Sequence, residues 1–168
     1  MSIGIFYGSS GGATESVAKM IKDKLEVESD LIDIADASRD SFGEYTEIIL
    51  GTSTWGEGEL QDDWEDAFAD FEAVDFSGKT VALFGLGDQE GYADNFLDGM
   101  GTLYQTLIKN GANIIGNNWS TKGYEFDKST AVVDGAFVGL AIDDDNQDDL
   151  TEERVAQWVP EILPYLQS

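Results

Sequence analysis

The segment from Ile3 to Leu25 constrains the fold most, because it joins a buried strand, a tight turn and the start of a helix. Ile3–Tyr7 is a short apolar run of the kind that forms a fully buried strand. Small and hydroxyl residues follow it, and an apolar pattern with helical spacing follows them. Such a turn exposes backbone N–H groups beside the positive end of a helix dipole. The segment therefore predicts a place for an anion.

The turn itself, residues 8–15, reads GSSGGATE. It matches neither the G-x-x-x-x-G-K-[ST] loop of ATP-binding proteins nor the G-x-G-x-x-G loop of dinucleotide-binding proteins. Since no Lys or Arg occurs between Met1 and Val17, a phosphate here would be held by backbone dipoles and hydroxyl groups alone. On this loop alone, an ordinary strand-to-helix turn without a ligand is the open alternative.

The sequence contains neither cysteine nor histidine. This excludes thiolate nucleophiles, disulfides, imidazole bases and most zinc or iron sites, so we expect any chemistry to belong to a bound cofactor. A length of 168 residues predicts a single domain, residues 1–168. The sequence shows no signal segment and no apolar run of membrane-spanning length, which predicts a cytoplasmic protein without a membrane partner.

The formal net charge is −25, from 34 Asp and Glu against 9 Lys and Arg. Such a charge makes nucleic acid a poor partner. It can steer a basic protein into contact, and less effectively at high salt. Solubility or adaptation to a salty interior would explain the same charge, and the count alone does not decide between these explanations.

Strand-like and helical patterns alternate along the chain, which predicts an α/β fold with a parallel sheet and right-handed crossovers. After the first strand and helix we expect strands at 31–34, 48–50, 80–84 and 112–115, and helices at 62–71, 95–109 and from 151 onward. Glycine-rich residues 51–59 and 85–94 predict irregular loops, and 38–44 a polar connection.

Two features complicate the C-terminal part of the chain. Residues 116–136 have no clear period, and a strand-like pattern resumes at 137–142, which predicts an insertion, about 120–136, that interrupts the fifth strand. Pro160 and Pro164 should bend the last helix or fray its end, because each removes a helical donor.

Ligands of parallel sheets bind beyond the carboxyl ends of the strands, so the loops after the first, third and fourth strands should meet at one site. The second of these loops carries Trp55 and the third carries Tyr92, both flanked by glycines. Aromatic rings stack well on a planar heterocycle, and glycines let the backbone approach its edge. A phosphate at one end and a flat ring at the other fit FMN. Trp64, which shares helical spacing with Phe68 and Phe71, is instead expected in the core.

Taken together, these motifs resemble the long-chain flavodoxin family. The resemblance runs from end to end and rests on residues 8–15, 53–55, 87–96, 119–124 and 143–151. It implies a doubly wound, three-layer fold with a five-stranded parallel sheet in the order 2-1-3-4-5. It also implies a monomeric carrier of single electrons at low potential, with non-covalent FMN and no enzyme activity of its own. The implied partners are basic redox proteins, such as a flavodoxin/ferredoxin-NADP reductase or a 2-oxoacid oxidoreductase.

By the same resemblance, the loop 9–14 would hold the phosphate, and Trp55 and Tyr92 would enclose the flavin ring. The residues expected to bind the cofactor are Ser9, Ser10, Gly11, Gly12, Ala13, Thr14, Ser53, Thr54, Trp55, Gly56, Glu57, Gly58, Leu86, Gly87, Asp88, Tyr92, Asn95, Phe96, Asp98 and Asp145. The sequence departs from the family at Gly11, where the family usually has Thr. The missing hydroxyl donor predicts weaker binding of the phosphate.

Three other functions compete with this interpretation. An FMN-dependent NAD(P)H:quinone reductase would share the fold, but it needs room for a substrate over the ring, which Trp55 and Tyr92 would cover. A response-regulator receiver domain would need acidic residues directly after the first strand, where this chain has glycine and serines. Residues 143–149 suggest a calcium loop, but Asp148 stands where glycine is needed and Arg154 where the bidentate Glu should be. We therefore expect no metal site there.

Overall fold

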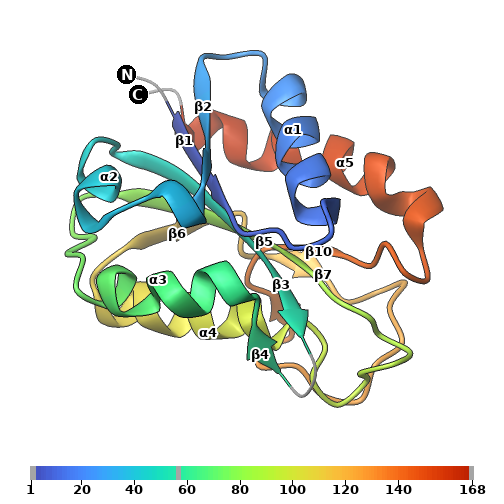
Figure 1. Ribbon diagram of the computed structural model, residues 1–168. Helices are drawn as coiled ribbons and strands as arrows, with labels where there is room; N and C mark the ends of the chain where they lie inside the picture. Colours follow the sequence, from blue (N-terminus) through green and yellow to red (C-terminus); the bar gives the residue numbers. More distant parts are fainter. Residues whose placement is uncertain (1–2, 56–57, 167–168) are drawn as a thin grey trace.

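The computed structural model describes residues 3–55 and 58–166, which form a central sheet between two layers of helices (Figure 1). One face of the sheet is covered by α1 (Ala13–Leu25) and α5 (Thr151–Leu166). The other face is covered by α3 (Asp62–Glu72) and α4 (Asp98–Lys109). The main strands, all parallel, lie in the order β10-β5-β3-β1-β2, with bounds β1 Ile3–Tyr7, β2 Ser29–Asp33, β3 Glu47–Trp55, β5 Thr80–Leu86 and β10 Leu140–Ile142. The predicted doubly wound sheet and its strand order are confirmed.

Both faces of the inner strands β1 and β5 are buried, which explains why these strands read as continuous apolar runs. Along β1, successive side chains alternate between the two helical layers. Ile3 and Ile5 pack in the cluster that includes Val17 of α1 and Val155 of α5. Phe6 packs in the opposite cluster with residues of the other layer, among them Trp64 of α3, Leu103 of α4 and the ring of Phe42, which stacks on Phe6. The core thus fixes the direction and register of β1, and with them the position of the loop that follows it.

The fifth strand is interrupted, as predicted. Two short segments, β6 (Asn113–Ile115) and β10, pair in parallel with successive parts of β5. Between them lies an insertion with its own antiparallel sheet of β7 (Trp119–Ser120), β9 (Ala136–Phe137) and β8 (Val132–Val133). Phe137 was expected to resume the fifth strand, but it pairs inside the insertion. The chain rejoins the main sheet through Gly139, where a Cβ atom would lie 2.1 Å from the carbonyl oxygen of Leu83.

The glycine-rich segment after the third strand is more regular than predicted. Instead of ending at Leu50, β3 continues to Trp55, and β4 (Glu59–Leu60) pairs back on it antiparallel. The expectation of irregular structure was wrong because Gly51 is a packing residue within the strand. A Cβ atom on Gly51 would lie 1.9 Å from the ring of Phe84, so a larger residue would displace that ring. In the same way β5 runs on to Leu86, beyond its predicted end.

Several other elements differ from the predictions. The connection after β2 contains the one-turn 3-10 helix Ile34–Asp36, instead of a strand to Ile34, and the helix α2 (Arg39–Gly43). Helix α4 begins at Asp98, not at Asn95, because Leu97 has a left-handed φ of 60°. A second 3-10 helix, Asp148–Leu150, precedes α5. Helix α5 does not fray at its two prolines but continues to Leu166, since its apolar stripe is buried as far as that residue.

Among the residues that the structure describes, no helix combines the length and the apolar character needed to cross a membrane.

Candidate functional site

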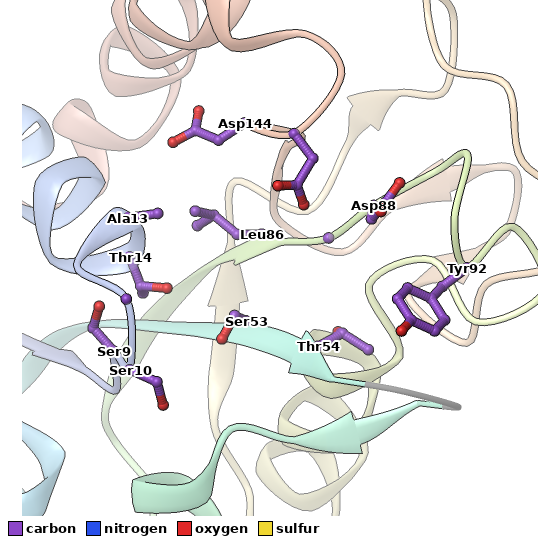
Figure 2. Close-up of a pocket in the computed structure, with 13 residues that line it drawn as sticks. Ser9, Ser10, Ala13, Thr14, Ser53, Thr54, Leu86, Asp88, Tyr92 and Asp144 are labelled. Atoms are coloured by element: carbon purple, nitrogen blue, oxygen red, sulfur yellow. The ribbon is translucent and has the colours of Figure 1, made fainter.

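A cavity of about 320 Å³ lies at the carboxyl ends of the parallel strands (Figure 2). The turn after β1, the end of β3 and the loops after β5 and β10 all contribute to it. The segments predicted to meet, which follow residues 7, 50 and 84, therefore do so, although the second of them is strand and not loop. In Figure 2, Ser9, Ser10 and Thr14 lie at one end and Tyr92 at the other. The lining residues are Ser9, Ser10, Gly11, Ala13, Thr14, Ser53, Thr54, Leu86, Gly87, Asp88, Tyr92, Asp144 and Asp145.

The end formed by the turn after β1 has the geometry of an anion site. Helix α1 begins directly at the cavity, and its N-cap residue, Gly12, has a left-handed φ of 92° and no side chain with which to cap the helix. Ser9 Oγ accepts a hydrogen bond of 2.9 Å from the N–H of Gly12, which folds the turn back on itself. The first-turn residues Ala13 and Thr14 line the cavity. Backbone N–H groups in the first turn of a helix lack helical partners and favour a negative charge.

Hydrogen bonds to the core hold the start of this turn in place. The N–H of Gly8 donates to the carbonyl oxygen of Gly51 at 3.2 Å, and Trp64 Nε1 donates to the same oxygen at 2.8 Å. Trp64 is fully buried, which confirms its predicted place in the core. A Cβ atom on Gly8 would lie 2.6 Å from Cδ1 of Trp64, so this tight approach requires glycine.

Thr54 and Tyr92 line the opposite end of the cavity, whereas the side chain of Leu86 points toward Ala13 (Figure 2). Tyr92 is 45% exposed, as is typical of a ring at the open edge of a site. Thr54 Oγ1 accepts from the N–H of Gly99 at 2.8 Å, which ties the end of β3 to α4. Trp55 ends β3, but its side chain, like Gly56 and Glu57, lies outside the described residues. That Trp55 and Tyr92 enclose a flavin, and that the Gly56–Glu57 region contacts it, stay predictions.

Carboxylates form one wall of the cavity. Asp88, Asp144 and Asp145 line it, and no Lys or Arg is among the described lining residues. Asp145 is exposed, but neighbouring atoms remove part of its solvation, and this effect, followed by the charges of Asp88, Asp143 and Asp144, raises its pKa. The pKa of Asp88 is lowered, because its carboxylate accepts hydrogen bonds from the N–H of Gly91 and from the Asn146 side chain. This wall therefore disfavours a further negative charge inside the cavity.

Sequence reasoning missed three residues that build this site. Asp144 lines the cavity beside Asp145. Asp143 lies fully buried behind the wall and accepts from the N–H groups of Asp145 and Asn146, each at 3.1 Å. Gln61 is fully buried and bonds to Ser10 across 51 positions of the sequence. The acidic run was visible in the sequence, whereas nothing local to Gln61 indicated its contact.

Five of the expected residues that the structure describes do not line the cavity, namely Gly12, Gly58, Asn95, Phe96 and Asp98. Phe96 is 1% exposed and packs on the rings of Phe126 and Phe137, so its side chain lies in the core. Asp98 accepts hydrogen bonds from Asn95 Nδ2 at 3.1 Å and from the N–H of Thr130 at 2.8 Å. A Cβ atom on Gly58 would lie 2.9 Å from Asp98 Oδ2, so Gly58, which directly precedes β4, lies against the Asp98 carboxylate. The cofactor contacts of all five residues stay predictions.

Comparison with known proteins identifies the family. A family model described as Flavodoxin matches residues 5–158. The chain belongs to the flavodoxin family. It is 50% identical to a flavodoxin of Synechocystis over 99% of this chain and 98% of the relative, and 48% identical to flavodoxin 1 of Escherichia coli over 95% of this chain and 91% of the relative.

A crystal structure of a flavodoxin from Fusobacterium nucleatum bound to flavin mononucleotide superposes with a TM-score of 0.93, at 30% identity and with 99% of each chain covered. The resemblance predicted from the sequence is confirmed. Flavodoxins are electron-transfer proteins and not enzymes, and nothing in these comparisons favours a quinone reductase.

Proposed function

We propose that the chain binds FMN non-covalently in the cavity of Figure 2 and carries single electrons at low potential between larger redox proteins. The observation that carries this proposal is the joining, in one cavity, of an uncapped helix start at Gly12 and an aromatic, glycine-lined end at Tyr92. Membership of the flavodoxin family and the FMN-bound relative support the same function.

The residues present suit a flavin nucleotide. The phosphate would be held by the hydroxyl groups of Ser9, Ser10 and Thr14 and by the backbone N–H groups of the first turn of α1. No cation is needed, because several neutral dipoles that converge on one point can neutralise a phosphate. Gly87 would allow close approach of the backbone to the cofactor, and Leu86 adds apolar surface to the cavity.

Bound FMN supplies the one-electron chemistry, and the residues of the chain set how readily an electron is released. Asp88, Asp144 and Asp145 raise the free energy of any added negative charge in the cavity. A bound flavin ring would itself displace water from this part of the cavity, and water would otherwise screen that repulsion. The protein thereby favours electron donation at low potential.

Reconstitution with FMN followed by a redox titration tests the proposal. We expect one FMN per chain, a yellow protein, and binding of riboflavin that is weaker because riboflavin lacks the phosphate. The proposal fails if the folded protein does not bind FMN. Steady-state turnover of NAD(P)H with a quinone would instead point to a reductase.

The partners that we propose are basic redox proteins, such as a flavodoxin/ferredoxin-NADP reductase or a 2-oxoacid oxidoreductase. The net charge of −25 supports this choice. Several of the nine cationic side chains are engaged within the fold, for example Lys79, whose Nζ donates to the carbonyl oxygen of Tyr45 at 2.7 Å. We further propose that the protein works as a monomer in the cytoplasm.

A further inference from the structure

Gln61 joins helix α3 to the turn that would hold the phosphate. Its Oε1 accepts hydrogen bonds from the N–H groups of Asp63 and Trp64, at 3.1 and 3.2 Å, and so caps α3. Its Nε2 donates to Ser10 Oγ and to Asp63 Oδ2, both at 3.0 Å. A primary amide has two donor hydrogens and two acceptor lone pairs, so this buried side chain uses all four.

The orientation of this amide follows from chemistry. Two backbone N–H groups face its oxygen, and an N–H can only donate, so the oxygen must point to the helix and the NH₂ group to Ser10. The amide lies directly against Gly8, where a Cβ atom would be 2.3 Å from Gln61 Oε1. Its four hydrogen bonds hold it in this orientation.

The fixed amide of Gln61 determines where the Ser10 hydroxyl directs its hydrogen. A hydroxyl that accepts from Gln61 must direct its own hydrogen elsewhere, and Ser10 lines the cavity at its phosphate end. We propose that Gln61 is a positioning residue for phosphate binding: it fixes the Ser10 hydroxyl as a donor to the FMN phosphate without touching the phosphate itself. This inference rests on the proposed FMN site.

Gln61→Glu tests the idea sharply. The carboxylate keeps both acceptor positions that cap α3, but it replaces the donor with an oxygen that accepts the Ser10 proton. Ser10 is then turned away from the phosphate. Because the introduced carboxylate would also face the carboxylate of Asp63, the variant is made together with Asp63→Asn, and Asp63→Asn alone is the matched control. We expect the Kd for FMN to rise at least tenfold relative to that control, and the Kd for riboflavin to stay within about twofold.

A double-mutant cycle separates positioning from mere charge. If Gln61 acts through Ser10, the Gln61→Glu change should have less than about a twofold effect on FMN binding once Ser10 is replaced by Ala. An equal loss in the Ser10→Ala background would overturn the inference, and so would an equal loss of riboflavin binding. Urea unfolding of each apo-variant shows that the loop and α3 are folded.

Should the glutamate variant not fold, Gln61→Met allows the same comparison with a neutral side chain of similar length. It removes the bond to Ser10 and also the two bonds that cap α3, so urea unfolding of the apo-variant is measured beside binding. FMN binding should weaken by at least threefold, and only while Ser10 is present. If the wild-type protein binds FMN and the Gln61→Met variant binds it with the same Kd, the role of Gln61 is refuted but the proposed function is not. Failure of the wild-type protein to bind FMN would refute the proposed function itself.

Discussion

The side-chain amide of Asn146 donates a hydrogen bond of 2.8 Å to Oδ1 of Asp88. The same amide donates to Asp143 Oδ2 at 2.9 Å, so it joins the loop after β5 to the loop after β10 at the acidic wall of the cavity. Gln89 strengthens the junction, since its Nε2 donates to Asp143 Oδ2 at 2.7 Å and its Oε1 accepts from the N–H of Glu125 in the insertion. The position of the wall therefore depends on the fully buried carboxylate of Asp143.

Replacing Asp143 with Asn should loosen this wall. The new NH₂ group would face donors, and buried donors left without an acceptor cost about 1–3 kcal/mol each. We expect the apo-protein to lose about 2–3 kcal/mol of unfolding free energy, measured by urea denaturation, and to bind FMN more weakly. Asp149→Asn, the same change at an exposed position nearby, should alter stability by less than about 0.5 kcal/mol. Equal effects of the two changes would contradict the role of Asp143.

Gly11→Thr should tighten FMN binding. A Cβ atom on Gly11 meets no atom within 4 Å, and its φ is not left-handed, so the larger residue fits without strain. The added hydroxyl lies at the phosphate end, where a hydrogen bond to a charged group should lower the Kd about tenfold. Gly11→Val has the same shape without the hydroxyl and is the control in equilibrium titrations with FMN and riboflavin. An equal gain with Val would show that chain stiffness, and not the hydroxyl, is responsible.

Asp145→Asn should raise the potential at which the bound flavin takes up its second electron. Fully reduced FMN is anionic, so removing a carboxylate from the wall relieves repulsion. Redox titration at neutral pH measures the shift, with Asp149→Asn as the control of equal charge change. The difference from the wild-type protein should shrink as the pH falls and Asp145 becomes protonated. A constant difference would argue against an electrostatic cause.

The raised pKa of Asp145 also predicts a trend in stability. A carboxyl whose pKa is higher in the folded state binds its proton more tightly there, so this group stabilises the fold as the pH falls through that pKa. Asp145→Asn should therefore make the apo-protein more stable than wild type at neutral pH, and the advantage should vanish in acid. Urea midpoints at neutral pH and near pH 4 check the sign. An advantage that grew in acid would be the wrong sign.

Asp88 should act in the opposite sense. Its pKa is lowered in the folded state, so its contribution to stability is complete above its ordinary value of 3.8 and is lost as the pH falls through the lowered pKa. Asn146→Ala removes one of the donors that lower this pKa. In acid denaturation followed by circular dichroism, this variant should unfold at a higher pH than wild type. An unchanged midpoint would show that Asn146 adds little to the stability of the Asp88 carboxylate.

Electron exchange with a basic reductase should slow as ionic strength rises. The net charge of −25 attracts a basic partner from a distance. At 0.1 M salt the attraction between exposed charges is largely screened beyond about 10 Å. Stopped-flow measurement of the second-order rate constant between low and high salt tests this. A rate constant independent of salt would remove the docking role of the acidic surface.

The sequence alone determined the architecture. Apolar runs buried on both faces specify parallel strands, and their alternation with helical patterns leaves few topologies. The composition and periodicity of short segments also located the turn at residues 8–15, the insertion in the fifth strand and the core position of Trp64. Each of these features depends on residues that are neighbours in the sequence.

Contacts between distant segments were decided by the tertiary structure. The strand character of Gly51 depends on the ring of Phe84, and the orientation of Ser10 depends on Gln61, 51 positions away. The side chain of Phe96 lies in the core because the insertion supplies the aromatic rings, Phe126 and Phe137, that cover it. Periodicity reports which side of a segment is buried, but a hydrogen bond or ring contact also needs the position of its partner, and only the folded chain fixes that position.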